Sequence, residues 1–280
     1  MTKNGQNTHS RENSSLTSFV ANHENNLIVW CITGGGDFFD ENYRIFVNLL
    51  LKKYPILVIF SDAGALVYNR YGFFWNLSKL NLKNTNLLFL FESQFVLDHN
   101  IEQLLRKSNA DYSALPKDPT FAKGIWLANH NLKCIVASPL TSNSVAKLTS
   151  GINDSMILNI LSAGKKAGQM IGIFPTDRGI DSITSSLPVR QKKPLKSQDF
   201  DTKVCAFGAL DSKKYSDVDF LPEFCVGCRK CVEKYPRNFA VDEEIEIHVR
   251  SIDQLNTQKL SDEFRVFHAP EEISIFISSL

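Results

Sequence analysis

The chain has 280 residues, with 31 Lys and Arg against 30 Asp and Glu. This length suits one large α/β domain, or one domain with a small appendage. The net charge of +1 gives no reason to expect nucleic acid or an anionic membrane as a partner. The apolar runs are strand-sized, far too short to span a membrane. The polar first 26 residues lack the apolar segment of an export signal, so we expect a disordered tail over residues 1–26 of a cytoplasmic protein.

Short apolar runs alternate with helical patterns from residue 27 onward. They predict strands over 27–33, 56–60, 87–91, 133–138 and 171–175, and helices over 40–54, 63–71, 101–107 and 145–166. Near-continuous apolar strands separated by helices are typical of a parallel sheet that is covered on both faces. We therefore predict an α/β fold over residues 27–177, a doubly wound parallel sheet in a three-layer Rossmann-like sandwich. A break in the last helix is indicated at Gly151.

The composition changes after Asp177. Residues 178–243 are predicted to be a small insertion, in which an irregular connection leads into a cysteine-rich segment. A strand over 246–252 and helical patterns over 254–264 and 270–280 follow. We expect residues 244–280 to return to the sheet and complete the core.

A turn rich in hydroxyl and amide groups follows the strand that begins at Cys134. It contains Ser138, Thr141, Ser142 and Asn143, and a helix begins directly after it. Free backbone N–H groups and the helix dipole favour anions at such a strand-to-helix turn. The simpler alternative is an ordinary helix cap, because Ser, Thr and Asn are the usual capping residues. The number of short polar side chains favours a ligand.

Two further loops are expected at the same edge of the sheet. Thr33, Gly34 and Gly35 follow the first strand, and Ser61 follows the second. The glycine spacing matches neither the dinucleotide fingerprint nor a Walker loop, which leaves a phosphate-binding turn with Thr33 as hydroxyl donor. Convergence of the three loops on one phosphate indicates a mononucleotide such as FMN.

The segment from Ser138 to Lys147 resembles the Pro-Ala-Thr/Ser-Ala-Asn-Thr motif of the flavin-containing cysteine-decarboxylase-like (HFCD) flavoproteins. The loop over 33–36 resembles the first loop of that family, most closely in the branch of archaeal-type flavoproteins and acceptor-type dihydromethanopterin reductases. The resemblance implies FMN bound in a trimer-based homo-oligomer. It implies as binding residues Thr33, Gly34, Gly35, Ser61, Ser138, Thr141, Ser142 and Asn143.

The chain departs from the decarboxylating members of that family. Those members carry Pro-x-Met-Asn after the last strand, where this chain has Pro175, Thr176 and Asp177. They also use a histidine, and neither His99 nor His130 lies in a recognisable match. These departures disfavour decarboxylation and favour redox chemistry.

The late cysteines form an independent motif. Cys225, Cys228 and Cys231 reproduce the C-x2-C-x2-C part of the bacterial ferredoxin run, with Tyr235 in place of its fourth cysteine. Cys205 lies in a sequence that resembles the one closing a ferredoxin half, so we predict it as the fourth ligand of a [4Fe–4S] cluster. Structural zinc is the alternative, because four thiolates also suit a tetrahedral site.

These observations lead to one principal hypothesis. We expect an FMN and [4Fe–4S] flavoprotein that transfers electrons from a ferredoxin-like donor to a small-molecule acceptor, for which the resemblance suggests a dihydromethanopterin-like pterin. Two alternatives remain open at this point. One is a flavin-dependent decarboxylase of the same fold, and the other is a non-catalytic binding protein that carries structural zinc.

Overall fold

The computed structural model places the chain in two compact units, Met1–Arg178 with Ser251–Leu280 and Gly179–Arg250. The structure describes residues 16–36, 38–83, 85–94, 99–114, 120–177, 182–185, 189–191, 195–196, 201, 204–205, 209–212, 217–221, 230–241 and 245–280. None of the described helices combines the length and apolarity that a membrane crossing requires.

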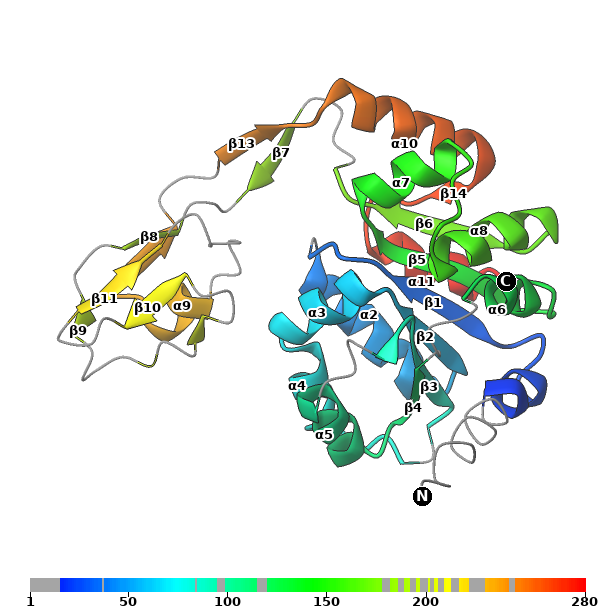
Figure 1. Cartoon of the computed structure of the whole chain (residues 1–280), viewed down its shortest axis with the longest axis horizontal. Coiled ribbons are helices and arrows are strands. Elements are labelled where there is room, and N and C mark those ends of the chain that lie inside the picture. The colour runs from blue at the N-terminus through cyan, green and yellow to red at the C-terminus, as the bar shows by residue number, and fades with distance from the viewer. Residues whose placement is uncertain are drawn as a thin grey trace, which may run out of the picture. The chain divides into compact units, whose positions relative to one another are not determined.

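The first unit is built on a seven-stranded sheet in the order β14-β6-β5-β1-β2-β3-β4 (Figure 1). All neighbouring strands in it are parallel. Its strands are β1 (Ile28–Ile32), β2 (Ile56–Phe60), β3 (Leu87–Phe91), β4 (Asp111–Ala114), β5 (Cys134–Leu140), β6 (Ile171–Pro175) and β14 (Arg265–Val266). This arrangement confirms the predicted doubly wound parallel sheet.

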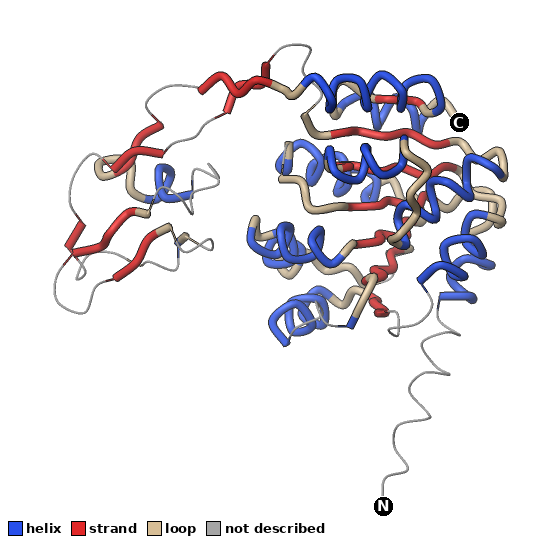
Figure 2. Tube along the Cα trace, turned by 45° about the horizontal axis from the view of Figure 1, so that its top comes forward, coloured by secondary structure: helices blue, strands red, loops and turns tan. Residues whose placement is uncertain are grey.

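Helices cover both faces of the sheet, as Figure 2 shows. One face packs against α2 (Phe39–Leu51), α3 (Asp62–Arg70), α4 (Phe73–Leu77), α5 (His99–Ser108) and α11 (Glu271–Ser278). The other packs against residues 16–22, α6 (Thr120–Ala128), α7 (Ser142–Thr149), α8 (Met156–Lys166) and α10 (Ser251–Glu263). Each face of the sheet has its own apolar core. Side chains of β1 alternate between the two, since Trp30 lies in the first core and Cys31 in the second. Three layers result, as predicted.

The break expected in the long helical pattern separates α7 from α8. Gly151 has a φ of 73°, a conformation that glycine adopts without the steric cost of a side chain. Ser155 then starts α8, and its side chain accepts a hydrogen bond from the backbone N–H of Leu158. The break therefore reflects local capping chemistry on both sides.

The predicted disordered tail over 1–26 is wrong for its second part. Residues 16–22 are helical, and Leu16 and Val20 are buried against the second core. Apolar residues at this i, i+4 spacing form one stripe of a helix, a short signal within a segment that is otherwise polar. Residues 1–15 lie outside the described residues.

The second unit contains antiparallel pairs of short strands. They are β7 (Ser182–Ser185), β8 (Val189–Gln191), β9 (Leu195–Lys196), β10 (Leu210–Ser212), β11 (Asp217–Phe220), β12 (Phe239–Val241) and β13 (Ile245–His248), with the short helix α9 (Lys230–Lys234). Strand β13 pairs with β7, so residues 245–248 do not return to the seven-stranded sheet, which corrects the prediction that 244–280 as a whole completes the core. Strands β7, β8 and β9 also lie where an irregular connection was predicted. They were missed because strands this short show little periodicity in the sequence.

Candidate functional site

The direction of chain winding reverses between β1 and β5, which are neighbours in the sheet. In open parallel sheets, ligands bind outside the carboxyl ends of the strands at such a switch point. Thr33 follows β1 and Thr141 follows β5, so two of the three predicted loops leave the sheet at this point. Ser61 follows β2, the other neighbour of β1.

Thr33 joins the first and third loops. Its Oγ1 donates to the carbonyl oxygen of Pro139 at 2.9 Å and accepts from the backbone N–H of Thr141, also at 2.9 Å. The side chain is buried, and its proton is used within the chain. Thr33 therefore shapes the site, which differs from the predicted role as hydroxyl donor to a phosphate.

Ser138 is also taken up by the fold. Its hydroxyl is fully buried and donates to Oδ1 of Asn42 on α2 at 2.6 Å. The side-chain amide of Asn42 donates to the carbonyl oxygen of Phe38 at 3.0 Å. We correct the prediction for Ser138 accordingly: its hydroxyl holds α2 against β5 and is not presented to a ligand. Asn42 was missed, although an amide within the apolar stripe of α2 was a usable signal.

The glycine loop is packed so closely that side chains do not fit. A Cβ on Gly34 would lie 2.9 Å from Cβ of Ala63, and one on Gly35 would lie 2.7 Å from Cγ2 of Thr176 and 3.3 Å from Pro139. The loop thus lies between the start of α3 and the loop that follows β6. The packing of the protein itself therefore requires glycine at both positions, and the N–H of Gly35 donates to the carbonyl oxygen of Thr33 at 2.9 Å.

The start of α7 forms the third wall. Thr141 is its N-cap and accepts from the backbone N–H of Ser144 at 3.4 Å. The backbone N–H of Ser142 donates to Oγ1 of Thr176 at 3.0 Å, which ties the helix to the loop after β6. Asn143 is exposed in the first turn, and within the described chain no hydrogen bond engages its side chain. Thr141 is thus a cap, as the simpler alternative held, and Asn143 remains available.

Ser61 caps α3 at the end of β2. Its Oγ accepts from the backbone N–H of Gly64 at 3.0 Å. A Cβ on Gly64 would collide with the carbonyl oxygen of Ile32, so α3 can start this close to β1 only with glycine there. The next residue, Asp62, accepts hydrogen bonds from Oγ of Ser93 at 2.9 and 3.0 Å.

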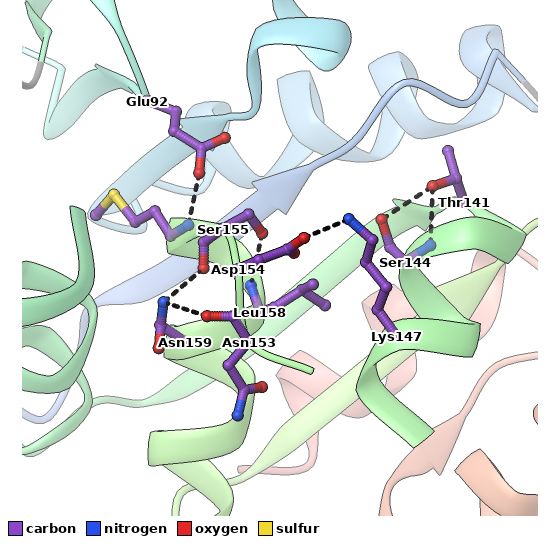
Figure 3. A network of polar contacts seen from close by, with 10 residues as sticks. Glu92, Thr141, Ser144, Lys147, Asn153, Asp154, Ser155, Leu158 and Asn159 are labelled. Atoms are coloured by element: carbon purple, nitrogen blue, oxygen red, sulfur yellow. Dashed lines mark hydrogen bonds and ion pairs between the residues drawn. The ribbon is translucent and has the colours of Figure 1, made fainter. Parts of the chain in front are cut away.

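A carboxylate network borders these loops (Figure 3). Oε1 of Glu92, directly after β3, accepts from the backbone N–H of Met156 at the start of α8 at 2.5 Å. Burial raises the pKa of the Glu92 carboxyl; the Met156 N–H opposes this rise, while nearby Asp62 and Asp154 add to it. Asp154 also pairs with Lys147 of α7 at 2.6 Å. Sequence analysis missed Glu92, because nothing in its local pattern marks it.

The donor set fits the phosphate of a flavin mononucleotide. The main-chain N–H of Gly34, the hydroxyl of Ser142 and the amide of Asn143 are neutral donors, which suit an anion without a compensating cation. The nearby cation, Lys147, is already paired with Asp154.

The predicted cluster ligands are only partly within the described residues. Cys205 and Cys231 both pack against the small apolar cluster formed by Leu210 and Phe239. Cys225 and Cys228 lie outside the described residues. The described part of the chain contains no group of three or more metal-ligating side chains, so the [4Fe–4S] cluster stays a prediction.

Comparison with known proteins identifies the family. The model of the flavoprotein family matches residues 17–179. An acceptor-type dihydromethanopterin reductase of Methanocaldococcus jannaschii is 29% identical over 260 residues, covering 91% of this chain and 96% of that protein. One from Methanosarcina mazei is 28% identical over 255 residues, covering 88% and 96%. Burkholderia xenovorans DmrB in complex with FMN aligns over 91% of this chain and 94% of its own, with a TM-score of 0.47 and 16% identity.

The family model spans more than half of the chain and covers all three loops of the site. This match confirms the resemblance first seen in the glycine loop and the Asn143 turn. The protein belongs to the flavoprotein family.

Proposed function

We propose that this flavoprotein is an FMN-dependent oxidoreductase that reduces a small pterin-like acceptor. One observation carries the proposal: the loops after β1, β2 and β5 meet at the switch point of the sheet. There the Thr33 hydroxyl ties two of them together with hydrogen bonds of 2.9 Å. The relatives in Methanocaldococcus and Methanosarcina are both acceptor-type dihydromethanopterin reductases, which favours a dihydropterin as the acceptor.

Some residues at this edge of the sheet bind FMN directly, and others position the loops that carry them. The main-chain N–H of Gly34 and the hydroxyls of Ser61 and Ser142 surround the phosphate, while Asn143 binds a polar edge of the cofactor. Gly35 keeps the loop packed against Thr176. The loops are held in place by hydrogen bonds of Thr33, Ser138 and Thr141 within the protein. FMN supplies the conversion between one-electron and two-electron transfer.

We propose a [4Fe–4S] cluster in the second unit, with Cys205, Cys225, Cys228 and Cys231 as its ligands. The ferredoxin-like spacing of the last three cysteines supports it, as does the packing of Cys205 and Cys231 against one apolar cluster. The cluster would accept single electrons from a ferredoxin-like donor. The family resemblance also favours a trimer-based homo-oligomer.

The test is an anaerobic purification with flavin, iron and zinc quantified per chain. We expect stoichiometric FMN, iron with broad visible absorbance, and oxidation of chemically reduced FMN on addition of a dihydropterin. Protein without flavin would overturn the proposed oxidoreductase. Stoichiometric zinc without iron would remove the cluster and leave the flavin site standing. If the dihydropterin does not oxidise the reduced flavin, a dihydropterin is excluded as the acceptor.

A further inference from the structure

Phe38 has an unusual backbone conformation for a bulky residue. It follows the glycine loop and is the N-cap of α2, with φ of 53° and ψ of 35°. Phe38 is 44% exposed. Left-handed backbone geometry is uncommon for a large side chain, because Cβ then crowds the following carbonyl group.

Two hydrogen bonds to the carbonyl oxygen of Phe38 hold this conformation. The carbonyl oxygen of Phe38 accepts from the backbone N–H of Asn42 at 2.9 Å and from its side-chain amide at 3.0 Å. Asn42 is buried and in turn accepts from Ser138. The strain at Phe38 is therefore maintained by the same contact that joins α2 to β5.

The core covers Phe38 only in part. Its ring packs edge to face on Phe174 of β6, with centroids 5.6 Å apart. A glycine or asparagine would adopt this conformation at lower cost. A strained, exposed aromatic ring beside a binding loop suggests retention for a ligand, since strained backbone concentrates at functional sites.

We infer that Phe38 is a stacking platform for a planar heteroaromatic ring, either the isoalloxazine of the flavin or the pteridine of the acceptor. This inference rests on the proposed function. Phe38 lies three residues after Gly35 in the chain, and aromatic faces bind flat, electron-poor heterocycles by offset stacking or by edge contacts. Phe38 touches the ligand in this role and performs no proton or electron transfer itself.

The test compares Phe38→Gly with a matched control, Lys53→Gly. Lys53 is exposed beyond the other end of α2 with φ of 61°, so both substitutions relieve left-handed strain on the same helix. Melting temperature, FMN affinity of flavin-free protein, and affinity of the FMN-loaded protein for pterin-6-carboxylate are measured. Phe38→Tyr keeps an aromatic face.

We expect neither glycine variant to lower the melting temperature. Phe38→Gly should lower the affinity for one of the two ligands about tenfold, whereas Lys53→Gly and Phe38→Tyr should bind both ligands as the parent does.

Loss of FMN affinity assigns the platform to the flavin, and loss of pterin affinity assigns it to the acceptor. Unchanged affinity for both overturns the inference while leaving the proposed function intact. A lower melting temperature, or a changed oligomeric state with both affinities kept, shows that Phe38 serves packing and also overturns it. Parent protein that binds no FMN refutes the proposed function instead.

Discussion

The hydroxyl of Ser138 and the amide oxygen of Asn42 lie 2.6 Å apart and are both buried. This contact joins β5 to α2, residues that are 96 positions apart in the chain. It supports the turn that carries Thr141 and also the helix that begins after the glycine loop. The geometry of the proposed flavin site therefore depends on a buried polar pair whose members bond to each other.

Ser138→Ala should destabilise the protein by about 1–3 kcal/mol, because it leaves the Asn42 amide oxygen buried without a partner. Asn42→Leu should cost a similar amount by stranding the Ser138 hydroxyl. The double variant Ser138→Ala with Asn42→Leu should cost less than the two together. Urea unfolding measures all three, and additive losses would show that the pair is not coupled.

Asn143→Asp should weaken FMN binding at least about tenfold, because a carboxylate would face the phosphate or a carbonyl edge of the cofactor. Ser150→Asp is the matched control, since Ser150 is exposed at the other end of α7 and adds the same charge there. Titration of flavin-free protein with FMN, followed by flavin fluorescence, measures both. Equal affinities in the two variants would place the flavin elsewhere.

Much of the fold was readable because most strands of the seven-stranded sheet are runs of apolar residues that end in a polar turn. Strands β1, β2 and β5 and the Gly151 break were predicted from that pattern. Strand β4 was missed, because its sequence Asp-Tyr-Ser-Ala lacks an apolar run. Strand β13 was predicted, but its pairing with β7 depends on tertiary context that alternation does not encode.

The site was readable at the level of loops and not of individual atoms. A serine or threonine after a strand predicts a polar group at the sheet edge, whichever partner its hydroxyl finds. Whether Ser138 faces a ligand or Asn42 is decided by residues distant in sequence. The same reason hid Glu92, whose partner Met156 lies 64 positions away.

The pH dependence of stability should change in Glu92→Gln. Burial raises the pKa of Glu92 in the folded protein, so the folded state holds a proton that the unfolded state has released. Stability therefore falls as pH rises from the ordinary glutamate pKa through the raised one. Glutamine keeps an oxygen for the Met156 N–H and does not ionise. Unfolding free energies between pH 4 and 7 should show a smaller fall for the variant, and parallel curves would contradict this origin.

The hydroxyl of Tyr68 on α3 is buried and has no hydrogen-bond partner among the described residues. Its ring packs between Phe39 and Phe73. Tyr68→Phe should leave stability unchanged or raise it by about 1 kcal/mol, because an unsatisfied buried hydroxyl carries a desolvation cost. Tyr43→Phe, at a partly exposed ring, is the control and should be neutral. A loss above about 1 kcal/mol at Tyr68 would indicate a buried water bound to the hydroxyl.

The two compact units allow the proposed cofactors to be separated by mutation. Cys225→Ser should remove most of the iron and the broad visible absorbance, because a serine oxygen is a poor substitute for a cluster thiolate. FMN content should stay at the parent level, since Cys225 falls in the unit Gly179–Arg250 and the flavin loops fall in the other. Glu233→Ser is the control. Glu233 is exposed and lies two positions after Cys231, so this variant should retain both iron and flavin.

The rate of flavin reduction by a one-electron donor should fall in Cys225→Ser, whereas chemically reduced flavin should be oxidised by a dihydropterin at the parent rate. Iron retained in Cys225→Ser would exclude this cysteine as a ligand, and loss of flavin together with iron would mean that the two units do not act independently.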